Sequence, residues 1–118
     1  RRDLSVSLDN VGRVAGVRGE WGVAEAAYQE SLEVRRGLEE LLGTPEARRD
    51  LSVSLNNVGR VAEARGEWGV AEAAYRESLE VRRELEHLLG TPQARQDVST
   101  SEENLKRLSQ KRADLGEL

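Results

Sequence analysis

Residues Ser54–Val81 read SLNNVGRVAEARGEWGVAEAAYRESLEV, and residues Ser7–Val34 read SLDNVGRVAGVRGEWGVAEAAYQESLEV. These stretches are the centres of two segments, 1–47 and 48–94, that differ at only seven positions. A third copy begins at Arg95 and soon diverges from the other two. A sequence period between about 20 and 50 residues is typical of solenoid proteins, in which repeated units stack on their neighbours.

The seven differences are spread over the whole repeat. Each joins a residue of the first copy to its counterpart 47 positions later: Asp9/Asn56, Gly16/Glu63, Val17/Ala64, Gln29/Arg76, Gly37/Glu84, Glu40/His87 and Glu46/Gln93. When the sequence is projected on helices at about 100° per residue, the differences within helices fall opposite the apolar stripe. We therefore expect all seven positions to be exposed and every core position to be identical.

Each repeat carries the start and stop signals of two helices. Thr44 precedes Pro45, which suits an N-cap followed by the first helical position. Apolar residues then recur at helical spacing, and Gly66 follows as a left-handed C-cap. This stripe consists of Leu51, Leu55, Val58 and Ala62. The same signals predict five helices, at about 1–18, 21–42, 45–65, 68–89 and 92–113, and no strands.

The composition argues against several classes of function. The chain has 118 residues, a net charge of −4 and no cysteine, and His87 is its only histidine. An acidic balance argues against nucleic-acid binding, and no run of about 18 apolar residues is present that could span a membrane. One histidine without cysteine leaves no zinc site or nucleophile–base pair. We therefore expect no catalytic residue, no metal and no cofactor.

The source and setting of the chain can also be predicted. It is rich in arginine, glycine and alanine and poor in lysine, which favours a GC-rich bacterial genome. It begins without methionine, so we expect a piece of a longer protein. It starts with no charged-then-apolar leader, and we expect a cytoplasmic location.

Charged residues alternate along the second predicted helix of each repeat. Arg76 with Glu80, and Arg82 with Glu86, are spaced four residues apart. This spacing predicts ion pairs on an exposed helix surface, each worth a few tenths of a kcal/mol.

The last predicted helix departs from the repeat at core positions. Compared with the second copy, Val98 replaces Leu51, Glu102 replaces Leu55, Lys106 replaces Gly59 and Ala113 replaces Gly66. These changes predict a polar cap beyond which no helical pair packs, with Leu105 and Leu108 on its inner face. We expect one array over 1–118, with repeats at 1–47 and 48–94 and a capping helix at 95–118. The N-terminal end has no such cap, so we expect homo-oligomers to form through it.

The quoted stretch resembles the tetratricopeptide repeat, whose pattern is Trp-x2-Leu-Gly-x2-Tyr, then Ala-x3-Phe, then Pro. The second copy matches with Leu55, Val58, Gly59, Ala62, Gly66, Trp68, Ala71, Tyr75 and Pro92. The first copy matches with Leu8, Val11, Gly12, Ala15, Gly19, Trp21, Ala24, Tyr28 and Pro45. The period exceeds the common one of about 34 residues. It looks most like the longer-repeat branch found in kinesin light chains and many bacterial regulators. The resemblance implies an all-α, right-handed α-solenoid of antiparallel helical pairs.

Proteins of this family bind other proteins, so the resemblance implies a concave groove for a peptide or a partner helix. On the groove face it places Asp9, Asn10, Arg13, Asn56, Asn57, Arg60 and Glu63. In similar proteins, asparagines at the places of Asn10 and Asn57 bind a peptide backbone, and Arg13 and Arg60 would hold a carboxylate. The alternative is that both asparagines tie neighbouring helices together and both arginines pair with Asp9 or Glu63.

Three functions remain open at this point. The first is a non-catalytic protein-interaction module within a larger bacterial protein. The second is a structural element whose near-identical repeats serve self-association. The third is the sensor array of a multidomain regulatory ATPase or protease, which an upstream phosphate-binding loop would reveal.

Overall fold

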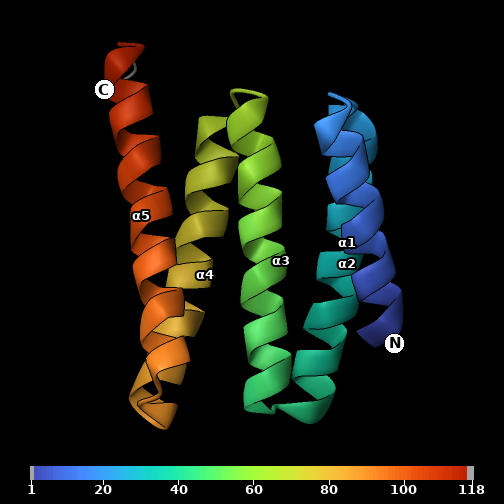
Figure 1. Cartoon of the computed structure of the whole chain (residues 1–118), viewed down its shortest axis with the longest axis vertical. Coiled ribbons are helices and arrows are strands. Elements are labelled where there is room, and N and C mark those ends of the chain that lie inside the picture. The colour runs from blue at the N-terminus through green and yellow to red at the C-terminus, as the bar shows by residue number, and fades with distance from the viewer. Residues whose placement is uncertain (1, 117–118) are drawn as a thin grey trace.

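The computed structural model describes residues 2–116, and these form five α-helices and no strand (Figure 1). The helices are α1 (Arg2–Val17), α2 (Trp21–Leu42), α3 (Pro45–Ala64), α4 (Trp68–Leu89) and α5 (Pro92–Asp114). Each predicted helix end within the described residues lies within one residue of the observed end. The prediction of an all-α helical repeat is confirmed, whereas the hand of the superhelix stays a prediction.

Local hydrogen bonds explain where the helices begin and end. The Thr44 Oγ1 atom accepts a hydrogen bond from the Ala47 N–H at 3.2 Å, and Pro45 occupies the first turn of α3. Gly66 follows α3 with a φ of +74°, a left-handed conformation that costs glycine little. Thr91 caps α5 with the same geometry, because the repeat brings the same residues to the next junction.

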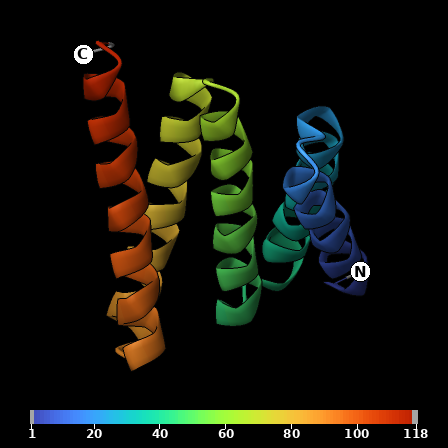
Figure 2. The same ribbon diagram turned by 45° about the horizontal axis from the view of Figure 1, so that its top comes forward.

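The five helices form two layers. Helices α1, α3 and α5 lie side by side in front in Figure 1, with α2 and α4 behind them, and Figure 2 shows the same order. Each helix packs on the next one along the chain. Helices α1 and α5 therefore lie at opposite ends of a short array.

The core is built from leucine, valine, alanine and tyrosine side chains. One buried cluster contains Ala15, Ala24, Tyr28, Leu32, Leu51, Leu55, Val58, Val61 and Ala74. A second contains Ala62, Ala71, Tyr75 and Leu108, with Trp68 and Leu105 packed against it. Gly59 faces the Tyr75 ring so closely that a Cβ at position 59 would lie 2.6 Å from Cε1. The repeat thus places its smallest residue opposite one of its largest.

Identical apolar residues are buried in α3 and exposed in α1. Leu51 and Val58 are 6% and 7% exposed, whereas their counterparts Leu4 and Val11 are 46% and 51% exposed. Helix α2 packs on α3, but no described residue covers the equivalent face of α1. Burial here depends on the neighbouring helix and not on the sequence of the repeat itself.

The prediction that all differing positions are exposed is wrong for Asn56 and Glu63. Each side chain is only 6% exposed. Both are polar, yet each is buried against partners on the following helices, which a projection of α3 alone does not include. The two differences therefore change contacts between helices.

Candidate functional site

Pairs of asparagine and arginine recur on α1, α3 and α5, which we call the first helices because each begins a repeat or the final helix of the array. They lie one turn apart on α1, α3 and α5, at intervals of 47 residues. We call them the Asn–Arg ladder, which consists of Asn10 and Arg13, Asn57 and Arg60, and Asn104 and Arg107.

On α3 and α5, the asparagine amide accepts a hydrogen bond from the arginine of the same helix. Arg60 Nη2 donates to Asn57 Oδ1, and Arg107 Nη1 donates to Asn104 Oδ1 at 3.0 Å. Asn57 and Asn104 are buried, whereas Arg60 and Arg107 remain exposed at their outer sides. A guanidinium has five donors, so the exposed Arg60 keeps donors for an external acceptor, whereas Arg107 already donates from Nε, Nη1 and Nη2 within the chain.

The predicted site residues do not all share this surface. Asn10, Arg13, Asn57 and Arg60 belong to the ladder, but Asp9 points inward and pairs with Arg35 at 2.8 Å. Asn56 and Glu63 are likewise buried, so three of the seven predicted residues face other helices.

A buried arginine on α2 connects α1 with α3, and a buried arginine on α4 connects α3 with α5. Arg82 on α4 donates from Nε to Ser52 Oγ on α3 at 3.0 Å. Its Nη1 donates to the Asp97 carbonyl and to Ser101 Oγ on α5, both at 3.1 Å. Arg35 makes the equivalent bonds one repeat earlier. The predicted surface pair of Arg82 with Glu86 is therefore wrong, because hydroxyl and carbonyl acceptors surround Arg82 in the interior.

The buried arginines Arg35 and Arg82 face different residues, because the first repeat has Asp9 where the second has Asn56. Asp9 gives Arg35 a carboxylate, whereas Asn56 gives Arg82 a neutral amide that accepts from Nη1 at 2.8 Å and donates to Ser78 Oγ at 3.0 Å. Burial lowers the pKa of Arg82, and the charge of Asp97 offsets part of that effect. Arg35 and Arg82 thus make equivalent hydrogen bonds, but Arg35 faces a negative charge and Arg82 faces a neutral group.

Glu63 is the acceptor of a polar cluster between α3 and α5. Its carboxylate accepts hydrogen bonds from Tyr75 Oη at 2.8 Å, from Arg107 Nη2 at 2.9 Å and from Lys111 Nζ at 3.3 Å. Burial alone would raise the pKa of Glu63, but these donors outweigh it and lower the pKa to about 2. The alternative that Arg13 and Arg60 pair with Asp9 or Glu63 is wrong, because both carboxylates pair with other cations.

A family model described as Tetratricopeptide repeat matches residues 51–86. The chain is a tetratricopeptide-type repeat protein. No curated protein matches it. Residues 4–39 are the same tetratricopeptide-type repeat, since they differ from residues 51–86 only at five of the seven positions given above. The resemblance to the kinesin-light-chain branch stays a prediction.

Sequence reasoning missed Asn104 and Arg107 as members of the tetratricopeptide-type face. The signal was present, because both follow Asn57 and Arg60 by the same 47 residues. The last helix departs from the repeat at core positions but retains these two polar positions.

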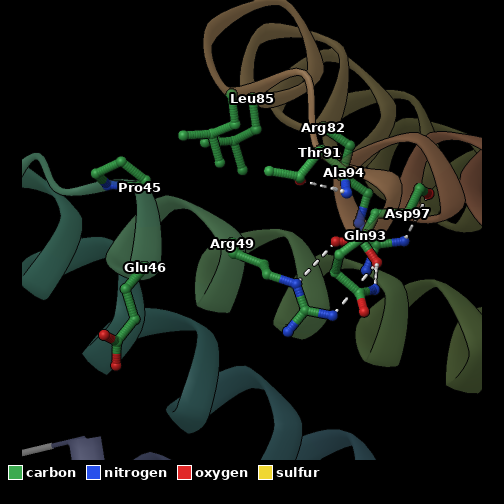
Figure 3. A pocket seen from close by; sticks show the side chains of 10 residues that line it. Pro45, Glu46, Arg49, Arg82, Leu85, Thr91, Gln93, Ala94 and Asp97 are labelled. Atoms are coloured by element: carbon green, nitrogen blue, oxygen red, sulfur yellow. Dashed lines mark hydrogen bonds and ion pairs between the residues drawn. The ribbon is translucent and has the colours of Figure 1, made fainter.

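Two hollows lie along one edge of the tetratricopeptide array. The second repeat forms one of about 230 Å³, shown in Figure 3, which lies among Pro45, Leu85, Leu89 and Ala94. It is also lined by the ion pair of Arg49 with Asp97, whose Nε and Oδ2 atoms are 2.8 Å apart. An equivalent hollow of about 280 Å³ occurs one repeat earlier. The charged groups of these hollows are already paired within the chain.

Two further properties of this tetratricopeptide-type protein concern metals and membranes. Among residues 2–116, no three His, Cys, Asp or Glu side chains come close enough to hold a metal ion. In the same residues, no helix combines the length and apolar character that crossing a membrane requires.

Proposed function

We propose that this chain is a non-catalytic protein-interaction module that binds an extended peptide or a partner helix along the Asn–Arg ladder. Tetratricopeptide repeats generally mediate protein–protein interaction, and the family match supports that role here. The observation that carries the proposal is the Asn–Arg ladder, which recurs on α1, α3 and α5 and in which amides hold the guanidinium groups of Arg60 and Arg107. Regular donors along three parallel helices suit the regular acceptors of a polypeptide backbone.

The ladder would belong to a single array over 1–118 that ends with α5. On α5, Glu102 and Lys106 are exposed at places where α3 has buried Leu55 and Gly59. Leu108 is buried and Leu105 half-buried on the inner side. A helix with one apolar and one polar face suits the C-terminal end of a solenoid.

Selected peptides can test the ladder without knowledge of the natural partner. Random dodecapeptides are displayed and selected on the full chain, and the binders are then measured against Arg13→Ala/Arg60→Ala and against Arg76→Ala. We expect the ladder variant to bind at least about tenfold more weakly, which is the scale of one lost charge-assisted hydrogen bond. Arg76 is an exposed arginine on α4 that pairs with Glu72, so its variant is the matched control.

The result of this measurement distinguishes binding along the Asn–Arg ladder from binding elsewhere on the chain. Equal binding to the ladder variant and to wild type, with unchanged helicity, would move the site to α2 and α4. Asn10→Ala is a useful third variant because Asn10 is exposed, whereas Asn57→Ala would also remove a buried hydrogen bond.

Self-association is the second candidate function. The observation that favours it is the exposure of Leu4 and Val11 on α1, where α3 buries the same residues under α2. A second copy of the chain could cover this face end against end, as a symmetric dimer.

A further inference from the structure

The polar contacts that hold α5 against α3 and α4 fall on a small set of α5 residues. Arg82 donates to the Asp97 carbonyl and to Ser101 Oγ, both at 3.1 Å. Arg49 binds the Asp97 carboxylate at 2.8 Å. Two acidic residues of the second repeat also receive cations from α5: Glu63 from Arg107 at 2.9 Å, and Glu72 from Arg112 at 3.6 Å.

Helix α1 carries the same polar residues in the same order. Two repeat periods before the contact residues of α5 stand the same residue types: Asp3, Ser7, Arg13 and Arg18. All four are exposed. The apolar residues also correspond, since Leu4, Val11 and Val14 of α1 are exposed where α5 has Val98, Leu105 and Leu108. The exposed face of α1 therefore matches the face that α5 turns toward α3 and α4.

Three features of α5 have no equivalent in α1. Val17 stands where α5 has Lys111, and Leu8 stands where α5 has Glu102. Because α1 begins at Arg2, it lacks a counterpart of the first turn of α5. In addition, α5 is joined to α4 by a short connection, which gives it an effective concentration of about millimolar. These features favour α5 at low protein concentration.

A second copy in the place of α5 would add one strong ion pair. Between α2 and α4, Arg36 donates to both carboxylate oxygens of Glu77, at 2.7 and 2.9 Å. One period after Arg36 stands Arg83, which pairs with Glu102 of α5 at 3.3 Å. One period before Glu77 stands Glu30, which is exposed on α2. If α1 of a second copy replaced α5, Arg83 would face Glu30 of that copy.

We propose that α5 is a displaceable cap, and that α1 of a second copy takes its place against α3 and α4. Copies then join head to tail, because each added copy ends in an α5 that can be displaced in turn. Such a contact is heterologous, so it leads to open chains of copies and not to a closed symmetric dimer. The inference concerns the two ends of the array and does not depend on peptide binding along the Asn–Arg ladder.

Hydrogen exchange of the wild-type chain, measured by mass spectrometry, tests the displacement directly. The rates are compared at about 20 µM and about 1 mM protein. We expect amides of α5 to exchange faster at the higher concentration and amides of α1 to exchange more slowly, because association releases one helix and covers the other. A symmetric dimer would protect α1 and leave α5 unchanged, and a monomer would change neither. Either of these results would overturn the inference.

A variant with a loosened α5 should associate more readily. Glu103 is exposed in the middle of α5, so Glu103→Pro disrupts this helix and leaves α1 unchanged. We expect it to form species larger than dimers in sedimentation, at a protein concentration at least about tenfold lower than Glu103→Ala requires. Adding Val11→Glu should remove this association, because Val11 lies in the proposed contact. The exchange measurement on the wild-type chain decides the inference even if Glu103→Pro does not fold.

Exchange of charges tests the direction of the contact. In the Glu103→Pro background, Glu30→Arg and Arg83→Glu each bring like charges together, so each should weaken association by about threefold. A mixture of the two variants should recover association, since the Arg83→Glu copy then meets the Glu30→Arg copy. Glu33→Arg, at another exposed position of α2, is the matched control. No recovery in the mixture, or an equal loss in Glu33→Arg, would show that copies do not join head to tail.

Discussion

Position 59 has room for only a hydrogen atom beside the Tyr75 ring, since a Cβ there would lie 2.6 Å from Cε1. The ring cannot move aside cheaply, because it is fully buried and its hydroxyl is bound to Glu63. We expect Gly59→Ala to destabilise the fold by about 1–3 kcal/mol through overpacking. A Cβ added at Gly37 would meet no atom within 4 Å, so Gly37→Ala should stabilise by about 0.5–1 kcal/mol.

Urea unfolding of both alanine variants checks this contrast. A third variant sharpens it, because a Cβ at Gly12 would lie 2.7 Å from Tyr28 Cε1, but no Glu63 equivalent holds the Tyr28 hydroxyl. Gly12→Ala should therefore cost less than Gly59→Ala. Equal shifts for all three variants would contradict the assignment of Gly59 as a close-contact position.

Glu63 makes the stability of the chain depend on pH in a defined direction. Its folded pKa of about 2 lies below the ordinary value of 4.5, so the charged form is favoured in the folded state. The resulting stabilisation is fully present above the ordinary pKa and is lost as pH falls through the folded pKa. We expect Glu63→Gln to be less stable by about 1–2 kcal/mol at pH 7 and to approach wild type near pH 2.

This difference is measured by urea unfolding of both proteins at pH 7, 4 and 2.5. The comparison of two proteins at each pH cancels the titration of the other carboxylates. A stability difference that stays constant over this range would show that the Glu63 carboxylate is not the group that stabilises the junction.

At the scale of helices, the sequence predicts boundaries well and lateral contacts poorly. Thr44, Pro45 and Gly66 act through their own backbone and the next turn, so their effect can be read without the fold. Arg82 depends on hydroxyl and carbonyl groups from α3 and α5, which are distant in sequence. An arginine beside glutamates therefore indicated an exposed ion pair, although its partners are serines across two helices.

In the Asn–Arg ladder, too, the sequence predicts which side chains share a helix face but not which of them a neighbouring helix buries. Asn57 and Arg60 could be predicted to share a face because they are one turn apart. That Asn56, the adjacent residue, is buried against α4 could not be predicted from α3 alone. Spacing fixes which side chains lie together, and the neighbouring helix decides whether they are exposed.

Because Asp9 and Asn56 face the buried arginines, substitutions at these two equivalent positions should change the free energy of unfolding in opposite directions. Asp9→Asn removes the carboxylate that pairs with Arg35 at 2.8 Å, and Asn56→Asp supplies one to Arg82. We expect the first to destabilise and the second to stabilise the chain, each by about 1 kcal/mol, since a charge-assisted bond exceeds a neutral one by that amount.

Urea unfolding at pH 7 and low salt measures both variants. The double exchange, which moves the carboxylate from the first junction to the second, is the matched control and should leave stability nearly unchanged. Effects of the same sign would show that the cost of burying the carboxylate exceeds its attraction to the guanidinium.

For the whole molecule, the uncovered face of α1 predicts association. Leu4 and Val11 are exposed on α1, and burial of this face should stabilise a dimer by removing apolar surface from water. We expect a melting temperature that rises with protein concentration, and dimers in sedimentation at micromolar to millimolar concentration.

Val11→Lys should abolish this dependence on concentration. Val70→Lys is the control, because Val70 on α4 is also 51% exposed but lies away from the face of α1. A wild-type chain that stays monomeric up to about 1 mM, with a constant melting temperature, would show that α1 ends the array unaided.

The cluster around Glu63 also bears on the order in which the repeats assemble. Because Val98, Leu105 and Leu108 give α5 an apolar face like that of α3, α2 can also pack on α5 during folding. In that wrong arrangement Gly16 would face Arg107 and Lys111, which would lose the carboxylate that they share in the native fold. We expect Glu63→Gly to refold with an added slow phase, measured by stopped-flow fluorescence, from molecules that must first separate mispaired helices. Single-phase refolding of this variant would contradict the idea. The side chain at position 63 then specifies which neighbour is correct, a choice that two similar apolar faces leave undetermined.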